Sequence, residues 1–374
     1  MIHRVLHVVS AMNRGGAETL LMNVYRNIDR SKVQFDFVSH RMESCDYDDE
    51  IISLGGRIYR IHSFGQQGPI AYLNELKKIM SQTNYVAVHS HTDYQSGFAA
   101  LAGKMAGIKK RICHSHSNNW GRGNGLKASM MFKVLQTVIH YAATDYCACS
   151  VEAARFLFGS SLTDSGKTFV MKNGIEIGRF VNIEASVQLD IKQELNIASE
   201  SKIIGHVGTF SPSKNHTFLL KVLKQMIDEE KDVIAVLVGD GALRSSIEAE
   251  ARRMGIFNRI RFLGVRVDIP KLMKSFDVFV FPSVFEGFGI VTVEAQCSGT
   301  PCVAADTVPK VTDMGVGLMS FISLDESLEA WSQQINMALF MKKPDQNTIL
   351  NKIASQGFDI RDSIHDWLDL YGVS

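Results

Sequence analysis

The sequence predicts an α/β protein with two doubly wound domains, each a parallel sheet flanked by helices. Short apolar segments alternate with longer amphipathic ones along almost the whole chain, which is typical of parallel strands joined by helical crossovers. Continuous apolar runs such as residues 233–238 have the composition of strands buried on both faces. A length of 374 residues exceeds what one hydrophobic core usually supports, which favours two domains.

Each half of the chain carries the elements of one such domain. In the first half we expect strands at 3–10, 33–39, 85–90 and 110–115, helices at 16–28, 70–81, 96–106 and 126–142, and a closing strand, helix and strand near Val170. In the second half we expect strands at 203–208, 233–238, 260–263 and 276–281, a helix at 215–229, and a helix on either side of 260–263. We assign each segment as strand or helix from the spacing of its hydrophobic residues.

The domain boundary is expected near residues 175–200. Residues 183–201 are polar and weakly patterned, so the domains are placed at 1–180 and 181–355. A last helix at about 360–371, within the terminal segment 356–374, has apolar residues at i, i+3, i+4 and i+7. Doubly wound sheets bind ligands beyond the carboxyl ends of their strands, so two facing sheets would share one cleft.

Composition narrows the class of protein. Apolar residues make up 45% and charged residues 21%, as in ordinary globular proteins. The six cysteines lack the paired C-x-x-C spacing of a structural zinc site, which favours buried reduced thiols. The apolar run at the N-terminus is too short for a signal peptide, and no apolar stretch reaches the ~18 residues of a membrane span. We therefore expect a cytoplasmic protein.

Charge is unevenly distributed. Residues 1–180 carry 21 Lys and Arg against 14 Asp and Glu, whereas residues 181–374 carry 19 against 25. The basic half could face an anionic partner, or the two halves could attract each other.

Segment 120–142, with Trp120 and several basic residues, predicts either peripheral contact with the inner face of an anionic membrane or an amphipathic core helix. The core helix is the commoner case, and the glycine-rich loop 121–125 before it is expected to move.

The most specific signal lies between Pro282 and Pro301, P-S-V-F-E-G-F-G-I-V-T-V-E-A-Q-C-S-G-T-P. A buried strand ends before it, and a short helix starts at about Ile290 and stops before Gly299. The free N–H groups at the start of this helix could hold a phosphate. Glu286 and Glu294 could accept hydrogen bonds from vicinal hydroxyls of a sugar and a ribose. On spacing alone, a solvated loop charge at Glu286 and a helix-start carboxylate at Glu294 would be the better explanation of the two residues.

Glu286 and Glu294 resemble the E-x7-E signature of retaining glycosyltransferases of family 4, which have the GT-B fold of two Rossmann-like domains. Segments 15–18 (G-G-A-E), 173–180 (N-G-I with Phe180), 208–215 (G-T-F-S-P-S-K-N) and 264–269 also resemble the family, in the same order and over nearly the whole chain. Within the family, the similarity is to enzymes that build exopolysaccharide and capsule repeat units. The resemblance implies an N-terminal acceptor domain, a C-terminal donor domain and a last helix that packs back on the first domain.

The resemblance also implies roles for the residues of the 282–301 segment. Glu294 would hold the ribose hydroxyls of the nucleotide, and Glu286 would contact hydroxyls of the donor sugar. The backbone of Phe288, Gly289 and Ile290 would hold the sugar and the phosphate.

The resemblance implies that other loops supply the remaining donor contacts. Lys214 would neutralise the diphosphate as charge builds on the leaving group, and Gly15 and Gly16 would let the backbone approach the donor closely. The family usually has Arg where this chain has Thr209, which offers a hydroxyl but no charge. Arg266 is our candidate for the missing cation.

Two H-x-H pairs follow predicted strands: His89 with His91, and His114 with His116. The resemblance implies one histidine after the second strand, near the anomeric carbon of the donor. His116 fits this position best and His114 is the alternative, so the expected catalytic residues are His116, Glu286 and Lys214. Four histidines could instead bind a metal. H-x-H pairs are weak signals and enzymes of this family need no ion, so we expect neither a metal nor a cofactor.

The sequence thus predicts a retaining glycosyltransferase that moves a sugar from a nucleotide-sugar, most simply a UDP-sugar, to a lipid-linked or saccharide acceptor in surface polysaccharide biosynthesis. The alternative is a nucleotide-sugar-binding pseudoenzyme in a synthase complex, which Thr209 motivates. A NAD-dependent dehydrogenase is disfavoured because no G-x-G-x-x-G follows the first strand and Ser39-His40 ends the second. No nucleic-acid partner is expected.

Overall fold

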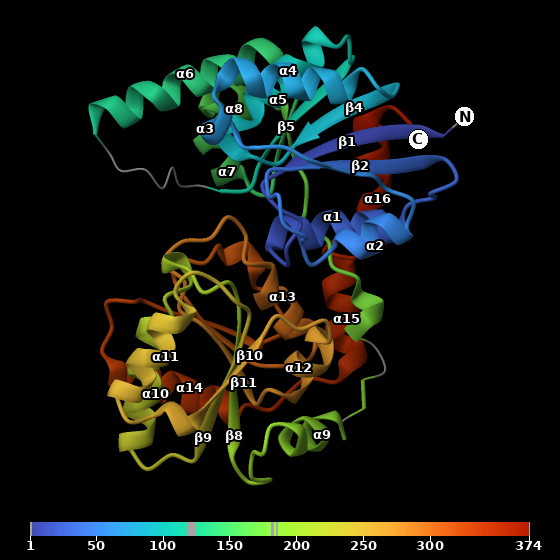
Figure 1. The fold of residues 1–374 in the computed structure, drawn as a ribbon. Helices are drawn as coiled ribbons and strands as arrows, with labels where there is room; N and C mark the ends of the chain where they lie inside the picture. The colour runs from blue at the N-terminus through green and yellow to red at the C-terminus, as the bar shows by residue number, and fades with distance from the viewer. Residues whose placement is uncertain (1, 118–124, 181–182, 185, 374) are drawn as a thin grey trace. The chain divides into compact units, whose positions relative to one another are not determined.

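The computed structural model describes residues 2–117, 125–180, 183–184 and 186–373, and it divides into two compact units (Figure 1). The first unit comprises residues 1–174 and 360–374, and the second comprises 175–359. The chain leaves the first unit between Gly174 and Ile175, inside the N-G-I segment, and returns between Asp359 and Ile360. Ile175 and Asp359 form a parallel bridge, so the two crossing segments run side by side.

The first unit is built on a seven-stranded sheet in the order β3-β2-β1-β4-β5-β6-β7, in which every neighbouring pair is parallel. Its strands are β1 (His3–Val9), β2 (Val33–Ser39), β3 (Ile58–Arg60), β4 (Tyr85–Ser90), β5 (Lys110–Ser115), β6 (Asp145–Ala148) and β7 (Thr168–Val170). Its helices are α1 (Gly16–Asn27), α2 (Asp48–Ser53), α3 (Phe64–Gln67), α4 (Pro69–Met80), η1 (Asp93–Gln95), α5 (Ser96–Met105), α6 (Leu126–Ala142), α7 (Val151–Phe158), α8 (Ser160–Asp164) and α16 (Ile360–Tyr371).

Helices cover both faces of this sheet (Figure 1). One hydrophobic cluster joins α4 and α5 to the sheet, and another joins α1 and α16 to it. Trp367 and Tyr371 of α16 are buried in the second cluster, against α1 and β1. The last helix of the chain is therefore part of the core of the first unit.

The second unit is built on a six-stranded parallel sheet in the order β10-β9-β8-β11-β12-β13. Its strands are β8 (Lys202–Val207), β9 (Val233–Val238), β10 (Ile260–Gly264), β11 (Val278–Phe281), β12 (Cys302–Ala305) and β13 (Met319–Ile322). Its helices are η2 (Ile177–Phe180), α9 (Val187–Glu194), η3 (Pro212–Lys214), α10 (His216–Asp228), α11 (Arg244–Arg253), η4 (Phe257–Arg259), α12 (Ile269–Ser275), α13 (Ile290–Cys297), η5 (Lys310–Thr312), α14 (Leu328–Leu339) and α15 (Gln346–Ser355).

Both faces of this second sheet are also covered. One cluster packs α10, α11 and α14 on the sheet, and the other packs α9, α12 and α13 on it. Both units are thus doubly wound, as the alternation of strands and helices predicts. All six cysteines are buried and unpaired.

No helix among the described residues is long and apolar enough to cross a membrane.

Candidate active site

Two loops at the carboxyl ends of neighbouring strands form the core of the candidate site in the second unit. The loop after β8 carries Lys214, and the loop after β11 carries Glu286. The backbone N–H of Val284 donates to the carbonyl of Ser213 at 2.7 Å, which ties the loops together. Both charged residues are predicted from the sequence, and the structure brings them into contact.

Lys214 and Glu286 form a shielded ion pair. Lys214 Nζ donates to Glu286 Oε1 at 2.5 Å, and the two side chains are only 20% and 10% exposed. The ammonium also lies 4.9 Å from the centre of the Phe281 ring. Each charge is compensated by the other, so a ligand that attracts Lys214 would release Glu286 for its own contacts.

The start of α13 offers unused hydrogen-bond donors. Gly289 is the residue before the helix and has φ +88°, a left-handed conformation that favours glycine. The backbone N–H groups of Gly289 and Ile290 donate to no residue that the structure describes. Phe288 is buried and stacks on Phe358, with 5.7 Å between the ring centres, which fixes the loop before the helix. Free donors at a helix start suit an anionic group.

Glu294 lies on α13, eight residues after Glu286. Burial raises the pKa of its carboxyl to about 7, although the charge of Arg179 lowers it. Its carboxylate accepts no hydrogen bond from the described part of the chain. A partly shielded carboxylate with free oxygens can accept hydrogen bonds from a pair of hydroxyls.

Thr209 and Arg266 lie in the same unit and differ in their surroundings. Thr209 is exposed at the end of β8. The guanidinium of Arg266 is held by both oxygens of Asp268, at 2.8 and 2.7 Å, and by Glu194 at 2.7 Å. The positive charge of Arg266 is therefore compensated by two carboxylates of its own unit.

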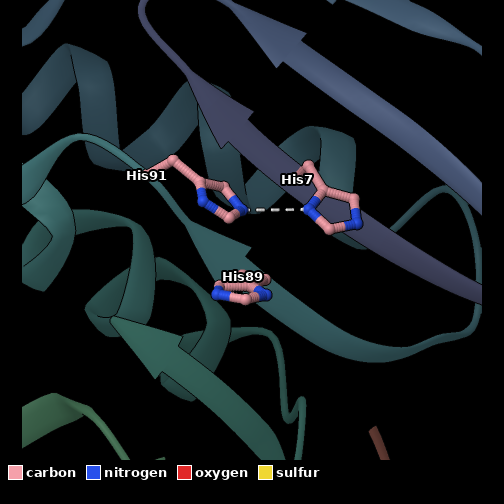
Figure 2. Close-up of side chains that lie close together, drawn as sticks. All are labelled: His7, His89 and His91. Atoms are coloured by element: carbon pink, nitrogen blue, oxygen red, sulfur yellow. Dashed lines mark hydrogen bonds between the residues drawn. The ribbon is translucent and has the colours of Figure 1, made fainter. Parts of the chain in front are cut away.

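In the first unit, five histidines gather at the carboxyl ends of β1, β4 and β5, which are neighbours in the sheet. They are His7, His89, His91, His114 and His116. Figure 2 shows His7 hydrogen-bonded to His91, with His89 beside them. Register explains the cluster, because His7 pairs with His89 across β1 and β4, so their side chains share a face of the sheet. Sequence reasoning missed His7, which lies within a strand and has no motif around it.

The two candidates for the active-site histidine differ in exposure. His114 is fully buried, whereas His116 is partly exposed. The backbone N–H of His116 donates to Asp93 Oδ1 at 2.7 Å, which fixes this turn after β5. Burial lowers the pKa of His116 to about 4, so its ring is neutral at pH 7. Of the two residues, His116 is the more accessible.

Two carboxylates near this edge were not among the predicted site residues. Glu18, in the G-G-A-E turn before α1, lies against Gly15, where a Cβ would collide with its carboxylate. Burial raises the pKa of Glu18 to about 7, and the nearby charge of Asp93 adds to this. Burial also raises the pKa of Asp93 to about 6. Glu18 was visible as the acidic end of the glycine turn, whereas the closeness of Asp93 to it depends on the sheet order.

Helix α6 has a mixed surface. It packs through Leu135, Ile139 and Ala142, which agrees with a core helix. On the outer side, Leu126, Met130 and Val134 are 89%, 70% and 58% exposed at a spacing of four residues. Trp120, Arg122 and most of the predicted loop 121–125 lie outside the described residues.

Residues 187–350 match the family described as glycosyl transferases group 1, and residues 14–179 match glycosyltransferase family 4. A Bacillus subtilis protein named as glycosyltransferase EpsF is 41% identical over 372 residues, which cover 99% of this chain and 97% of that protein. The Escherichia coli UDP-Gal:alpha-D-GlcNAc-diphosphoundecaprenol alpha-1,3-galactosyltransferase is 26% identical and covers 63% of this chain and 61% of its own length.

Among solved structures, Anabaena HepE in complex with UDP and glucose superimposes with a TM-score of 0.79 at 22% identity. The match covers 98% of this chain and 99% of HepE. It shows a shared GT-B fold of two Rossmann-like domains. The identity to EpsF over the full length, together with the two family matches, settles the assignment: the chain belongs to glycosyltransferase family 4 and is a glycosyltransferase of the GT-B fold.

Proposed function

We propose that this enzyme is a retaining glycosyltransferase that moves a sugar from a UDP-sugar to a lipid-linked or saccharide acceptor in surface polysaccharide biosynthesis. One observation carries the proposal. The free N–H groups at the start of α13 lie on the same loop as Glu286, which is paired with Lys214. Donors and a cation together suit a diphosphate, and the adjacent carboxylate suits the hydroxyls of the sugar.

In the proposed reaction, the bond between the anomeric carbon and the diphosphate breaks, and the electron pair leaves with the diphosphate. Lys214 and the N–H groups of Gly289 and Ile290 stabilise that charge. Glu286, released by Lys214, accepts hydrogen bonds from the donor sugar, and Glu294 accepts them from the ribose. The acceptor oxygen bonds to the anomeric carbon on the same face, and its proton passes to an oxygen of the departing diphosphate.

The first unit contributes the remaining proposed contacts. Neutral His116 would lie near the anomeric carbon, and the Gly15–Gly16 turn would approach the donor with its backbone. We propose no metal and no cofactor, because the cation and N–H groups named above supply the charge stabilisation that an ion would otherwise give.

The nucleotide and the acceptor are proposed from relatives. HepE was solved with UDP, and the E. coli relative is named for UDP-galactose and a diphosphoundecaprenol-linked sugar. A lipid-linked acceptor would bring the enzyme to the inner face of the membrane. The exposed stripe Leu126, Met130 and Val134 on α6, flanked by exposed Lys127 and Lys133, has the composition of a surface that rests on an anionic bilayer. We therefore propose a cytoplasmic enzyme in peripheral contact with the membrane.

The second candidate is a nucleotide-sugar-binding pseudoenzyme in a synthase complex. Thr209 carries no charge, and Arg266 is already held by Asp268 and Glu194. The site would then stabilise the leaving diphosphate with one side-chain cation where the family usually has two.

Thermal unfolding of the purified protein with UDP-, GDP-, ADP- and CMP-sugars tests the proposal. A nucleotide-sugar at about 100 times its dissociation constant should add roughly 2.7 kcal/mol to the free energy of unfolding. A shift with UDP-sugars, together with release of UDP in the presence of lipid-linked acceptors, supports the transferase. Binding without turnover on any acceptor favours the pseudoenzyme. No shift with any nucleotide-sugar would overturn both candidates.

A further inference from the structure

The five clustered histidines form two hydrogen-bonded chains. In the first, His7 Nδ1 lies 3.1 Å from His91 Nε2, and His91 Nδ1 lies 2.9 Å from His116 Nε2. In the second, the Tyr371 hydroxyl lies 2.9 Å from His89 Nδ1, and His89 Nε2 lies 3.1 Å from His114 Nδ1. The first chain leads from the interior to the partly exposed His116, the residue that we propose near the donor sugar.

Ring orientation favours hydrogen bonding over metal binding. Two sets of three histidines bring ring nitrogens within 4.8 Å of one another. A tetrahedral zinc site needs nitrogens that converge at ~2.0–2.1 Å on one ion, with the rings radiating outward. Here the rings of His114 and His116 stack, with centres 4.1 Å apart, and those of His89 and His91 lie 4.2 Å apart at an angle of 33°. Both nitrogens of His89 are also engaged, by Tyr371 and His114.

The first chain has a preferred direction. A neutral imidazole has one N–H and one lone pair, so each bond in the chain fixes the next ring. His7 Nε2 is buried and bonds to none of the described residues. A buried N–H without a partner costs more than an unpaired acceptor, so the proton of His7 belongs on Nδ1, where it is donated to His91. His91 must then carry its own proton on Nδ1 and donate it to Nε2 of His116.

We propose that His91, supported by His7, is a positioning residue that holds His116 in the tautomer with its proton on Nδ1. Nδ1 of His116 bonds to no residue in the described part of the chain. It therefore presents an N–H to the substrate and acts as a hydrogen-bond donor to a sugar oxygen, not as a base. Burial lowers the pKa of His91 well below its usual value, which keeps the chain neutral. The role of this donor rests on the proposed function, whereas the tautomer does not.

Nuclear magnetic resonance of the full-length protein with ¹⁵N-labelled histidine measures the tautomer directly. The His116 signals are assigned by comparison with His116→Asn. We expect the wild-type ring of His116 to carry its proton on Nδ1, and His91→Leu to shift it towards Nε2–H. His91→Asn keeps an amide donor near the position of Nδ1 and should restore the wild-type pattern. His114→Leu, which removes a ring stacked on His116 but none of its hydrogen bonds, should leave the tautomer unchanged.

Activity provides a second readout. His91→Leu should lower kcat/KM roughly three- to tenfold, the value of one hydrogen bond, and His91→Asn should recover it. The wild-type spectrum shows which ring nitrogen of His116 carries the proton, even where a variant does not fold. A proton on Nε2 of wild-type His116 would overturn the proposal, as would a stoichiometric metal in the purified protein whose removal by chelator shifts the His7 and His91 signals. If His116 carries its proton on Nδ1 but the protein binds no nucleotide-sugar, the proposed function is overturned and the proposed role of His91 stands.

Discussion

Lys214 and Glu286 form one ion pair, with 2.5 Å between Nζ and Oε1, although 72 residues separate them. The pair joins the loops after β8 and β11, next to the start of α13. In this pair a cation and a carboxylate are in contact, and each is shielded from solvent. In the proposed complex, a donor with a diphosphate and a sugar would present a partner for each charge, so binding would exchange one ion pair for two new contacts.

Breaking this pair should affect stability and activity differently. Lys214→Met leaves Glu286 shielded and unpaired, so we expect a loss of roughly 1–3 kcal/mol in unfolding free energy, below the cost of a fully buried pair because both side chains are partly exposed. The double variant Lys214→Met with Glu286→Gln should recover most of that stability but no turnover. Denaturant unfolding and UDP release measure the two effects. Wild-type turnover in the double variant would contradict the proposed roles.

Glu294→Gln should stabilise the protein above pH 7 and weaken donor binding. The carboxyl has a folded pKa of about 7 against 4.5 in the unfolded chain, so its ionisation makes stability fall as pH rises from 4.5 through 7. We expect a gain of roughly 1–3 kcal/mol at pH 8, and about tenfold weaker UDP-sugar binding because a charged acceptor is lost. The exposed Glu326→Gln is the control. Unchanged binding in Glu294→Gln would contradict a charged hydrogen bond from Glu294 to the ribose.

Buried histidines should make the protein sensitive to mild acid. Burial lowers the pKa of His7 to about 3, of His116 and His206 to about 4 and of His216 to about 2, whereas the unfolded value is 6.5. The unfolded chain then binds more protons below pH 6.5, so stability falls as pH drops. Three carboxyls with raised pKa values act in the opposite direction, but they are outnumbered.

The melting temperature measured from pH 7.5 to 5 checks this dependence. His216 is the matched test position, because neither ring nitrogen has a partner among the described residues and its ring stacks on Phe210. His216→Leu should reduce the stability lost between pH 7.5 and 5 by about 2 kcal/mol. An identical pH dependence in this variant would show that His216 is protonated in the folded state.

The exposed stripe on α6 should bind anionic membranes. Replacing Leu126, Met130 and Val134 by Ser removes apolar surface without changing charge, so sedimentation with phosphatidylglycerol vesicles should weaken about tenfold. Ser at Met337 and Phe340, which are 59% and 73% exposed in the second unit, is the control. Binding of the wild type should be lost on phosphatidylcholine vesicles and at high salt. Equal binding to both lipids would contradict an electrostatic attraction between this surface and anionic lipids.

The sequence by itself determined the fold class and most of the elements that surround the site. The predicted helices at 290–297 and 360–371 and the strand at 233–238 agree with α13, α16 and β9. Their apolar patterns are strong because each element buries a defined face. It did not predict the short edge strand β3, nor β12 and β13 after residue 301. Segments of three or four residues have only a weak periodic pattern, so some of them are missed.

Only the tertiary structure decided which site residues meet. Lys214 and Glu286 were each named from their own loops, but their contact depends on β8 and β11 being neighbours in the sheet. The histidine chain depends in the same way on the order β1-β4-β5 and on the register of His7 with His89. The sequence predicts Arg266 as an available cation, but its guanidinium donates hydrogen bonds to Asp268 and Glu194. Local patterns report which face of an element is buried, whereas partners distant along the chain are chosen by strand order, which no local pattern encodes.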